Sequence, residues 1–200
     1  MDNERLKKQL DFIIEIDKLK QIFRQNYLIS QSDRFENDVE HSWHLAILCI
    51  IISEYTVENE TIDILKVLIM VLIHDIVEID AGDTYCHDEI AKKDQEKKEQ
   101  IASKRIFSIL PNDQAEELLC IWNEYEKGET KEAKYAFALD RIQPLLMIYL
   151  TNGKTWLEHE ITYAQEYERN KVIEEVCPGI WEYAKVIMED SLKKGLLKGN

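Results

Sequence analysis

One apolar stretch that ends in ionisable side chains constrains this chain most. Residues 62–73 are almost continuously hydrophobic, and His74, Asp75, Glu78 and Asp83 follow at once. On a helix, adjacent residues and residues three or four apart lie on neighbouring parts of the surface. A buried helix has no structural need for such a polar end, and imidazole with carboxylate suits zinc, manganese, iron or cobalt. The stretch therefore predicts a metal site at the C-terminal end of a buried helix.

A scarcity of helix-breaking residues predicts an all-α fold. The 200 residues include only six glycines and three prolines, and 45% of the chain is apolar. Glycine and proline punctuate β-rich chains, so their scarcity favours helices. The length fits one domain, which we expect to cover residues 1–200. No apolar run is long enough to cross a bilayer.

The charge balance narrows the classes of partner. The formal net charge is −14, from 39 acidic and 25 basic residues. Such a surface repels polyanions, so long DNA or RNA is not an expected partner. A small phosphorylated substrate is still compatible, because a metal ion and a few basic residues reverse the field locally. The four cysteines lack the spacing of a zinc or redox motif, and residues 1–12 do not have the apolar region of a signal peptide. We therefore expect a cytoplasmic protein.

Hydrophobic periodicity divides the chain into helices and connections. Helices are predicted over residues 4–24, 37–55, 61–80, 100–110, 113–127, 130–150, 158–176 and 180–195. Residues 25–38 are predicted to be a polar connection, 151–157 a loop, and 87–99 either a solvated loop or an exposed helix start. Asn37 and Glu40 have the spacing of a capping box at the start of the second helix. Gly82 stands where the third helix should stop.

Two histidines precede the apolar part of the second helix. His41 and His44 are three residues apart and share one face. A lone histidine at such a place is more often a hydrogen-bonded helix residue than a ligand. The downstream pair His74 and Asp75 favours a ligand role for His41, which is nearer the polar end. His44 is expected to support a ligand or to pack in the core.

Asp140 lies in the middle of an otherwise apolar helix. Burial of an isolated carboxylate costs several kcal/mol unless a partner compensates. Arg141 is adjacent, and adjacent side chains do not face each other on a helix. The sequence leaves two partners open, namely a metal ion and a distant lysine or arginine.

Two further residues have alternative interpretations. Arg24 is predicted to close the first helix, either as a solvated charge that complements the helix dipole or as a functional cation. Asp83 follows the expected helix stop, where it either caps the next element or swings back toward His74 and Asp75.

The order of these candidates resembles a known family. His41, then His74 with Asp75, then Asp140 resembles the ligand order of the HD-domain superfamily of metal-dependent phosphohydrolases. The segment HDIVEIDAGD is similar to a motif of the branch that includes the 5′-deoxynucleotidases. EHSWHLA and ALDRIQPLL are similar to its first and last ligand segments. The resemblance spans about residues 15–185, and it implies an HD-domain bundle of about seven to nine helices.

The resemblance also implies roles for individual residues. His41, His74, Asp75 and Asp140 would bind one divalent metal, for which Mn, Co, Zn, Fe and Mg are the candidates. Glu78 would position or activate the attacking water, Asp83 would assist proton transfer, and Arg24 would grip the substrate phosphate. Deoxynucleotidases have a tryptophan directly after this arginine, whereas this chain has Gln25, so a preference for 2′-deoxy substrates does not follow.

The sequence is most compatible with a metal-dependent phosphomonoesterase. We expect it to release phosphate from small phosphorylated metabolites, above all nucleoside 5′-monophosphates. A phosphodiesterase or an alarmone hydrolase is the alternative among enzymes, because other HD branches catalyse both reactions. A helical metal-binding scaffold without turnover is the alternative from another class, against which Glu78 and Asp83 argue. A homodimer is an expectation at the level of the family.

Overall fold

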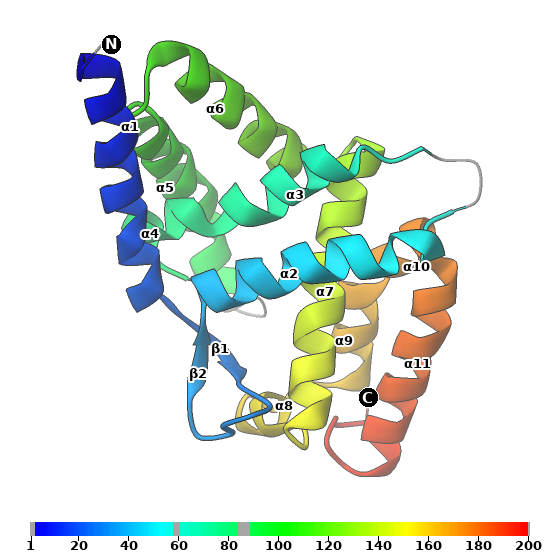
Figure 1. The fold of residues 1–200 in the computed structure, drawn as a ribbon. Coiled ribbons are helices and arrows are strands. Elements are labelled where there is room, and N and C mark those ends of the chain that lie inside the picture. The colour runs from blue at the N-terminus through cyan, green and yellow to red at the C-terminus, as the bar shows by residue number, and fades with distance from the viewer. Residues whose placement is uncertain (1–2, 58–60, 84–88, 200) are drawn as a thin grey trace.

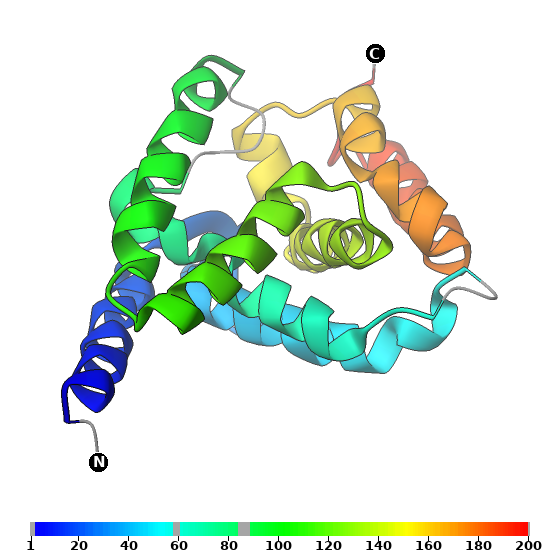
Figure 2. The same ribbon diagram turned by 90° about the horizontal axis from the view of Figure 1, so that it is seen from above.

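Helix α7, Lys131–Leu150, is the element around which the rest of the chain packs. The computed structural model describes residues 3–57, 61–83 and 89–199. Figure 2 looks along α7 and shows other helices on several sides of it. The side chain of Thr130 caps its start by accepting a hydrogen bond from the Ala133 amide. Tyr135, Leu139 and Asp140 are among its buried residues, so the central helix brings a carboxylate into the interior.

Two helices cross α7 side by side. They are α2, Asp38–Ile52, and α3, Ile64–Ile73 (Figure 1). The capping box predicted for Asn37 and Glu40 is present at the start of α2, with both reciprocal hydrogen bonds. It fixes the first turn of α2, which carries His41.

The remaining helices cover the two sides of α7 (Figure 2). One group comprises α1, Asn3–Ile16, α4, Glu78–Ala81, α5, Glu89–Phe107, and α6, Asn112–Lys127. The other comprises α9, Tyr163–Asn170, α10, Val172–Val176, and α11, Pro178–Lys193, with the short α8, Lys154–Glu158, near the C-terminal end of α7. The predicted helical fold is therefore confirmed.

One small hairpin is an addition to the predicted all-α fold. Strands β1, Phe23–Tyr27, and β2, Phe35–Asn37, pair antiparallel. They lie mainly in the segment 25–38 predicted to be a polar connection, but β1 begins two residues earlier, within the first predicted helix. The rings of Tyr27 and Phe35 stack with centroids 4.5 Å apart. This cross-strand pair gives the hairpin the side-chain contact that strands this short require.

The first predicted helix is too long. Helix α1 ends at Ile16, a 3₁₀ segment covers Asp17–Gln21, and Arg24 lies on β1. Leu19 continues the apolar pattern and is buried, but it reaches the core from 3₁₀ backbone. The hydrophobic periodicity of residues 4–24 therefore predicts the burial of Leu19 correctly, but it predicts an α-helix where the backbone is a 3₁₀ segment. Arg24 therefore does not close a helix.

The predicted helix 61–80 is broken in the middle. Helix α3 ends at Ile73, a 3₁₀ segment covers His74–Val77, and α4 follows. Gly82 stops α4 with a φ of +77°, which glycine adopts at little cost. The break places His74 and Asp75 at an irregular joint between helices.

Two connections near the C-terminus also differ from the prediction. The predicted loop 151–157 contains most of α8, and the predicted helix 158–176 is interrupted after α8. Glu160 has a φ of +55°, and the next residue, Ile161, is buried. A positive φ cannot continue a right-handed helix. Helix α5 shows that the charged stretch after residue 87 is a helix start rather than a loop.

The interior consists of two hydrophobic clusters. The larger one includes Leu45 and Leu139, and the smaller one includes Ile76 and Val77. His74 and Asp75 lie in the chain between Ile73 and Ile76 of the smaller cluster, whereas Asp140 directly follows Leu139 of the larger one. The predicted metal ligands thus lie at the junction of the two clusters. Across the described residues, no helix combines the length and the apolar character that a membrane span requires.

Candidate metal centre

The joint between α3 and α4 holds the His-Asp pair. His74 and Asp75 are both buried, and His74 Nε2 lies 3.1 Å from Asp75 Oδ1. His74 Nδ1 lies 3.0 Å from the carbonyl oxygen of Val71, to which it donates when it carries the proton. Trp122 Nε1 donates to the carbonyl oxygen of His74 at 3.1 Å. These two contacts fix the ring and its backbone, and they leave Nε2 facing the carboxylates.

His41 and Asp140 meet the pair from α2 and α7. His41 Nε2 lies 3.0 Å from Asp140 Oδ1, which is also 3.9 Å from His74 Nε2. His41 is fully buried. Burial and Arg24 both lower its pKa, but the contacts with Asp140 and Glu36 outweigh them and raise it to about 9.

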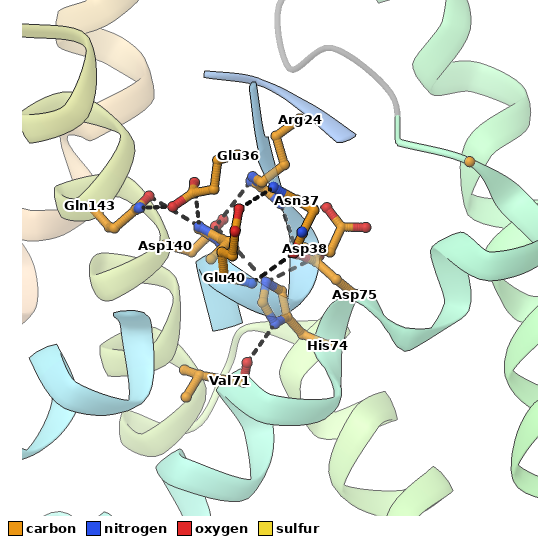
Figure 3. A network of polar contacts seen from close by, with 12 residues as sticks. Arg24, Glu36, Asn37, Asp38, Glu40, Val71, His74, Asp75, Asp140 and Gln143 are labelled. Atoms are coloured by element: carbon orange, nitrogen blue, oxygen red, sulfur yellow. Dashed lines mark hydrogen bonds and ion pairs between the residues drawn. The ribbon is translucent and has the colours of Figure 1, made fainter. Parts of the chain in front are cut away.

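The four predicted ligands therefore converge. One ligand atom from each of His41, His74 and Asp75 lies within 4.8 Å of the others, and Asp140 joins them through His41. Figure 3 shows His74, Asp75, Asp140 and Arg24 in one polar network. The sequence predicts that three helices bring residues 41, 74, 75 and 140 together, and this geometry agrees with that prediction. The assignment of the four as metal ligands stays a prediction.

A buried polar network supports His41 from behind. Gln143 accepts from His41 Nδ1 at 3.0 Å and donates to Glu36 Oε1 at 2.7 Å. Gln143 Nε2 also lies 3.2 Å from His44 Nδ1. His44 thus lies one contact away from His41, as expected for a supporting residue. The supporting role of Gln143 and Glu36 could not be predicted from the sequence, because neither residue belongs to a metal-binding pattern.

Arg24 reaches the centre from the hairpin. Its guanidinium lies 2.7 Å from Asp75, 3.7 Å from Asp140 and 3.8 Å from Asp38. Burial opposes its charge, yet the surrounding carboxylates keep its pKa well above the ordinary value. Of the two interpretations of Arg24, the solvated helix-end charge is wrong, because the side chain is only 12% exposed.

Glu78 and Asp83 share a cavity with the predicted ligands. The cavity has a volume of about 380 Å³, and Arg24, His74, Asp75 and Asp140 also contribute to its walls. Burial and then Asp75 raise the pKa of Glu78 well above its ordinary value, and burial also raises the pKa of Asp83. The outer walls come from α5, α6, α7 and α9, through Gln95, Glu96, Glu99, Tyr125, Glu126, Phe137, Arg141 and Arg169.

Asp38 is an acidic residue that sequence reasoning missed. It is the first residue of α2 and its side chain is fully buried. Burial and the nearby Asp75 raise its pKa to about 8, although Arg24 and Glu78 act in the other direction. An acidic residue in the first turn of a helix is ordinary in sequence, which is why Asp38 gave no signal.

Asp140 also has a partner that the helix argument excluded. Arg141 Nη1 lies within ion-pair distance of Asp140 Oδ2. The long arginine side chain curves back over its own turn, so adjacency did not prevent the contact. The distant basic residue of the predicted alternatives is Arg24, whose Nη2 lies 3.7 Å from Asp140 Oδ1, and Arg141 is an additional partner.

The residues present are suited to a divalent cation. Asp38, Asp75, Glu78, Asp83 and Asp140 surround Arg24, and three of these carboxyl groups have raised pKa values. His74 Nε2 is buried without a hydrogen-bond partner. A buried polar nitrogen without a partner is costly. A cation bound by His41, His74, Asp75 and Asp140 would satisfy that nitrogen and offset the excess negative charge.

Comparisons with known proteins agree with the motif resemblance. Residues 16–181 match the family model described as HD domain. Human 5′-deoxynucleotidase HDDC2 is 28% identical over 158 residues, which cover 79% of this chain and 74% of the human protein. The Dictyostelium discoideum protein of the same name is 29% identical over 143 residues, which cover 70% and 75% of the two chains.

Solved structures show the same fold. The crystal structure of a predicted metal-dependent phosphohydrolase from Magnetospirillum magnetotacticum MS-1 superimposes with a TM-score of 0.91 at 45% identity, and the match covers 97% of this chain and 96% of that one. A conserved protein from Pyrococcus furiosus has a TM-score of 0.61 at 23% identity, covering 92% and 99%. The second likeness concerns the fold alone.

Proposed function

Because this chain belongs to the HD-domain family of metal-dependent phosphohydrolases, we propose that it is a phosphomonoesterase that acts on small phosphorylated metabolites. Nucleoside 5′-monophosphates are the substrates proposed first, since curated relatives at 22–29% identity are 5′-deoxynucleotidases. The observation that carries the proposal is the meeting of His41, His74 and Asp75 with Asp140. Three of the four, His74, Asp75 and Asp140, line one acidic cavity.

The proposed metal ligands are His41, His74, Asp75 and Asp140. A bound divalent ion supplies Lewis-acid activation of water and of the phosphoryl group. The contribution of the histidines is to present Nε2 to the centre, because Gln143 and the Val71 carbonyl engage the Nδ1 atoms. Nitrogen and carboxylate ligands held in this way fit several first-row metals.

Glu78 is proposed to handle the proton of the attacking water. Its carboxyl group is buried in the cavity wall, where burial and Asp75 raise its pKa, so it holds a proton more readily than an exposed glutamate does. Asp83 lines the same cavity from beyond Gly82 and is proposed to pass the proton onward. Arg24 is proposed to donate hydrogen bonds to phosphoryl oxygens, for which a guanidinium is well suited.

The size of the cavity supports a small substrate. A volume of about 380 Å³ lies at the lower end of the range for small-molecule sites. Gln25, which follows Arg24, is held through its carbonyl oxygen by the Thr155 hydroxyl at 2.9 Å. By the sequence resemblance, Gln25 stands where deoxynucleotidases have a tryptophan near the sugar. We therefore propose that ribonucleotides and deoxyribonucleotides are both substrates.

Phosphate release from a panel of 5′-monophosphates tests this proposal. The protein is supplemented with Mn²⁺ or Co²⁺ and compared with Glu78→Gln, which keeps the shape of the side chain and removes its acid–base function. We expect kcat to fall on the order of 10²- to 10⁴-fold. Glu116→Gln, on the exposed surface of α6, is the matched control and should leave kcat unchanged.

Three outcomes distinguish the alternatives. Preferential cleavage of a phosphodiester or of a guanosine tetraphosphate-type alarmone would replace monoester hydrolysis with the corresponding activity. Metal binding without turnover of any substrate would support the scaffold. Full activity of Glu78→Gln would remove Glu78 from the mechanism.

Asp140→Asn tests the ligand set separately. The variant should contain markedly less metal after gel filtration, because an amide is a weaker ligand than a carboxylate. Elemental analysis measures the metal, and circular dichroism checks that the helices are retained. Asp33→Asn, on the exposed turn between β1 and β2, is the control. Unchanged metal content in Asp140→Asn would contradict the assignment.

A further inference from the structure

Arg24 contacts two of the proposed metal ligands. Its Nη1 lies 2.7 Å from Asp75 Oδ2, and its Nη2 lies 3.7 Å from Asp140 Oδ1. A divalent cation bound by the same carboxylates would compete with the guanidinium for their oxygens. Two neighbouring cations also repel each other strongly where water is largely excluded. Asp140 Oδ1, which Arg24 approaches, is also the oxygen that contacts His41. We therefore expect metal binding to weaken the contact of Arg24 with at least one of these carboxylates.

Asp38 is a third carboxylate within reach of Arg24. Its Oδ1 lies 3.8 Å from Arg24 Nη1, and neither Asp38 oxygen has a hydrogen-bond partner in the structure. Arg24 Nε is likewise buried without a partner. Buried polar atoms that lack partners are uncommon and indicate a specific role. Arg24 and Asp38 are thus already a long ion pair, and a shift of the guanidinium would shorten it to a hydrogen bond.

The backbone holds Asp38 and Arg24 next to each other. The Asp38 amide donates to the carbonyl oxygen of Ile22 at 3.2 Å, and Phe23 pairs with Asn37 across the hairpin. The capping box on Asn37 fixes the same turn of α2. Because both backbones are fixed, rotation of the Arg24 side chain is enough to bring the guanidinium onto Asp38.

We propose that Asp38 is a positioning residue that receives the Arg24 guanidinium when a divalent cation binds Asp75 and Asp140. This inference rests on the metal site of the proposed function. Paired with Asp38, Arg24 stays in the wall of the cavity and keeps N–H groups available for the phosphoryl oxygens of a substrate. Asp38 itself touches neither the ion nor the substrate in this arrangement.

A simpler role for Asp38 makes a different prediction. If Asp38 acts only as a negative charge near the centre, its removal weakens cation binding whether or not Arg24 is present. If it acts by receiving Arg24, its removal has an effect only when Arg24 is present. A double-mutant cycle separates these two roles.

The cycle uses the Mn²⁺ dissociation constant, measured by titration calorimetry or by the electron paramagnetic resonance of free Mn²⁺. The four proteins are the wild type, Asp38→Asn, Arg24→Gln and the double variant. We expect Asp38→Asn to weaken Mn²⁺ binding about tenfold, as for other residues that orient a metal site indirectly. Arg24→Gln should bind Mn²⁺ at least as tightly as the wild type, and the double variant should match Arg24→Gln.

The proposal would be overturned if Asp38→Asn weakened Mn²⁺ binding equally in the wild type and in Arg24→Gln. It would also be overturned if Asp38→Asn did not weaken Mn²⁺ binding in the wild type. If circular dichroism shows that Asp38→Asn does not fold, Asp38→Ser replaces it in the same cycle. Asp38→Glu keeps the carboxylate and should recover part of the lost affinity. Asp33→Asn is the control for a distant lost charge.

Phosphate binding gives a second measurement. Inorganic phosphate is titrated into the Mn²⁺-loaded proteins at saturating Mn²⁺, and the change in melting temperature reports binding. We expect Asp38→Asn to weaken phosphate binding severalfold and, with an active substrate, to raise KM more than it lowers kcat. Unchanged phosphate binding would contradict the positioning of Arg24. A wild type that binds Mn²⁺ but hydrolyses nothing would refute the proposed function, while the Mn²⁺ cycle would still decide the role of Asp38.

Discussion

At the scale of single residues, the two histidines of the centre are oriented in the same way. His41 Nδ1 contacts the Gln143 side chain and His74 Nδ1 contacts the Val71 carbonyl, each at 3.0 Å. Each contact engages Nδ1 and turns Nε2 toward a carboxylate, which is Asp140 for His41 and Asp75 for His74. The centre is thus arranged for ligation by residues that would not touch the ion.

Replacement of Gln143 tests this orientation. Gln143→Leu removes the contact with His41 and leaves the buried Glu36 without its donor. We expect Mn²⁺ affinity to fall about 10- to 100-fold, as measured by titration calorimetry. Gln31→Leu, on an exposed turn, controls for the loss of an amide and should retain full affinity. Wild-type affinity in Gln143→Leu would show that His41 needs no support.

The sequence revealed ligand candidates better than supporting residues. His74 and Asp75 stood out because a polar pair ended an apolar run, and Asp140 because it interrupted another. Gln143 had no such contrast, since a glutamine on a helix is ordinary. Asp38 resembled any acidic residue of a first helical turn. Supporting residues are defined by contacts across the fold, which a single sequence does not contain.

At the scale of elements, the sequence predicts features that depend on nearby residues, and it does not predict elements that depend on distant ones. The capping box at Asn37 was predicted because its hydrogen bonds close within four residues. Strand β1 and helix α8 were both missed, and they contact each other. Lys154 Nζ lies 3.5 Å from the centroid of the Tyr27 ring, and the Tyr27 hydroxyl donates to Glu158 at 3.0 Å. Each element depends on a partner more than 100 residues away.

Two capping boxes allow a matched test of whether the position of helix α2 affects metal binding. Asn37 caps α2, which carries His41, whereas Thr162 caps α9. Asn37→Ala and Thr162→Ala should each destabilise the protein by about 1 kcal/mol, which lowers the melting temperature by roughly 2–4 °C.

Only Asn37→Ala should also weaken Mn²⁺ binding, because only that cap holds a turn next to proposed ligands. Calorimetry of both variants measures the two effects side by side. Equal loss of Mn²⁺ affinity in Thr162→Ala would mean that general stability, rather than the placement of α2, controls the centre.

At the scale of the whole molecule, one face is unusually apolar. Nine large apolar side chains of α1, α2 and α3 are 42–70% exposed, namely Leu10, Ile13, Ile14, Trp43, Ile47, Ile50, Ile51, Leu65 and Leu72. Ile13, Trp43 and Leu72 line one groove of about 420 Å³, which joins the three helices. Together the nine present on the order of 800 Å², about what one partner contributes to a standard interface.

We propose that a second copy of the chain covers this face in a homodimer. Trp43→Glu places a charge in the groove and should give a monomer, because the lost contact and the added charge both oppose association. Light scattering coupled to size exclusion measures the mass. Tyr183→Glu alters an equally exposed aromatic residue on α11 and should leave the dimer intact. A wild-type monomer at all concentrations would exclude the dimer.

The contact between His41 and Asp140 joins residues 99 positions apart in the chain. The pair exists only where α2 is docked on α7, so a segment that lacks either helix cannot assemble the ion site. An ion that binds only the completed centre slows unfolding and leaves the folding rate largely unchanged. Metal supply would then govern how long a finished molecule survives in the cell, not how quickly a newly made chain matures.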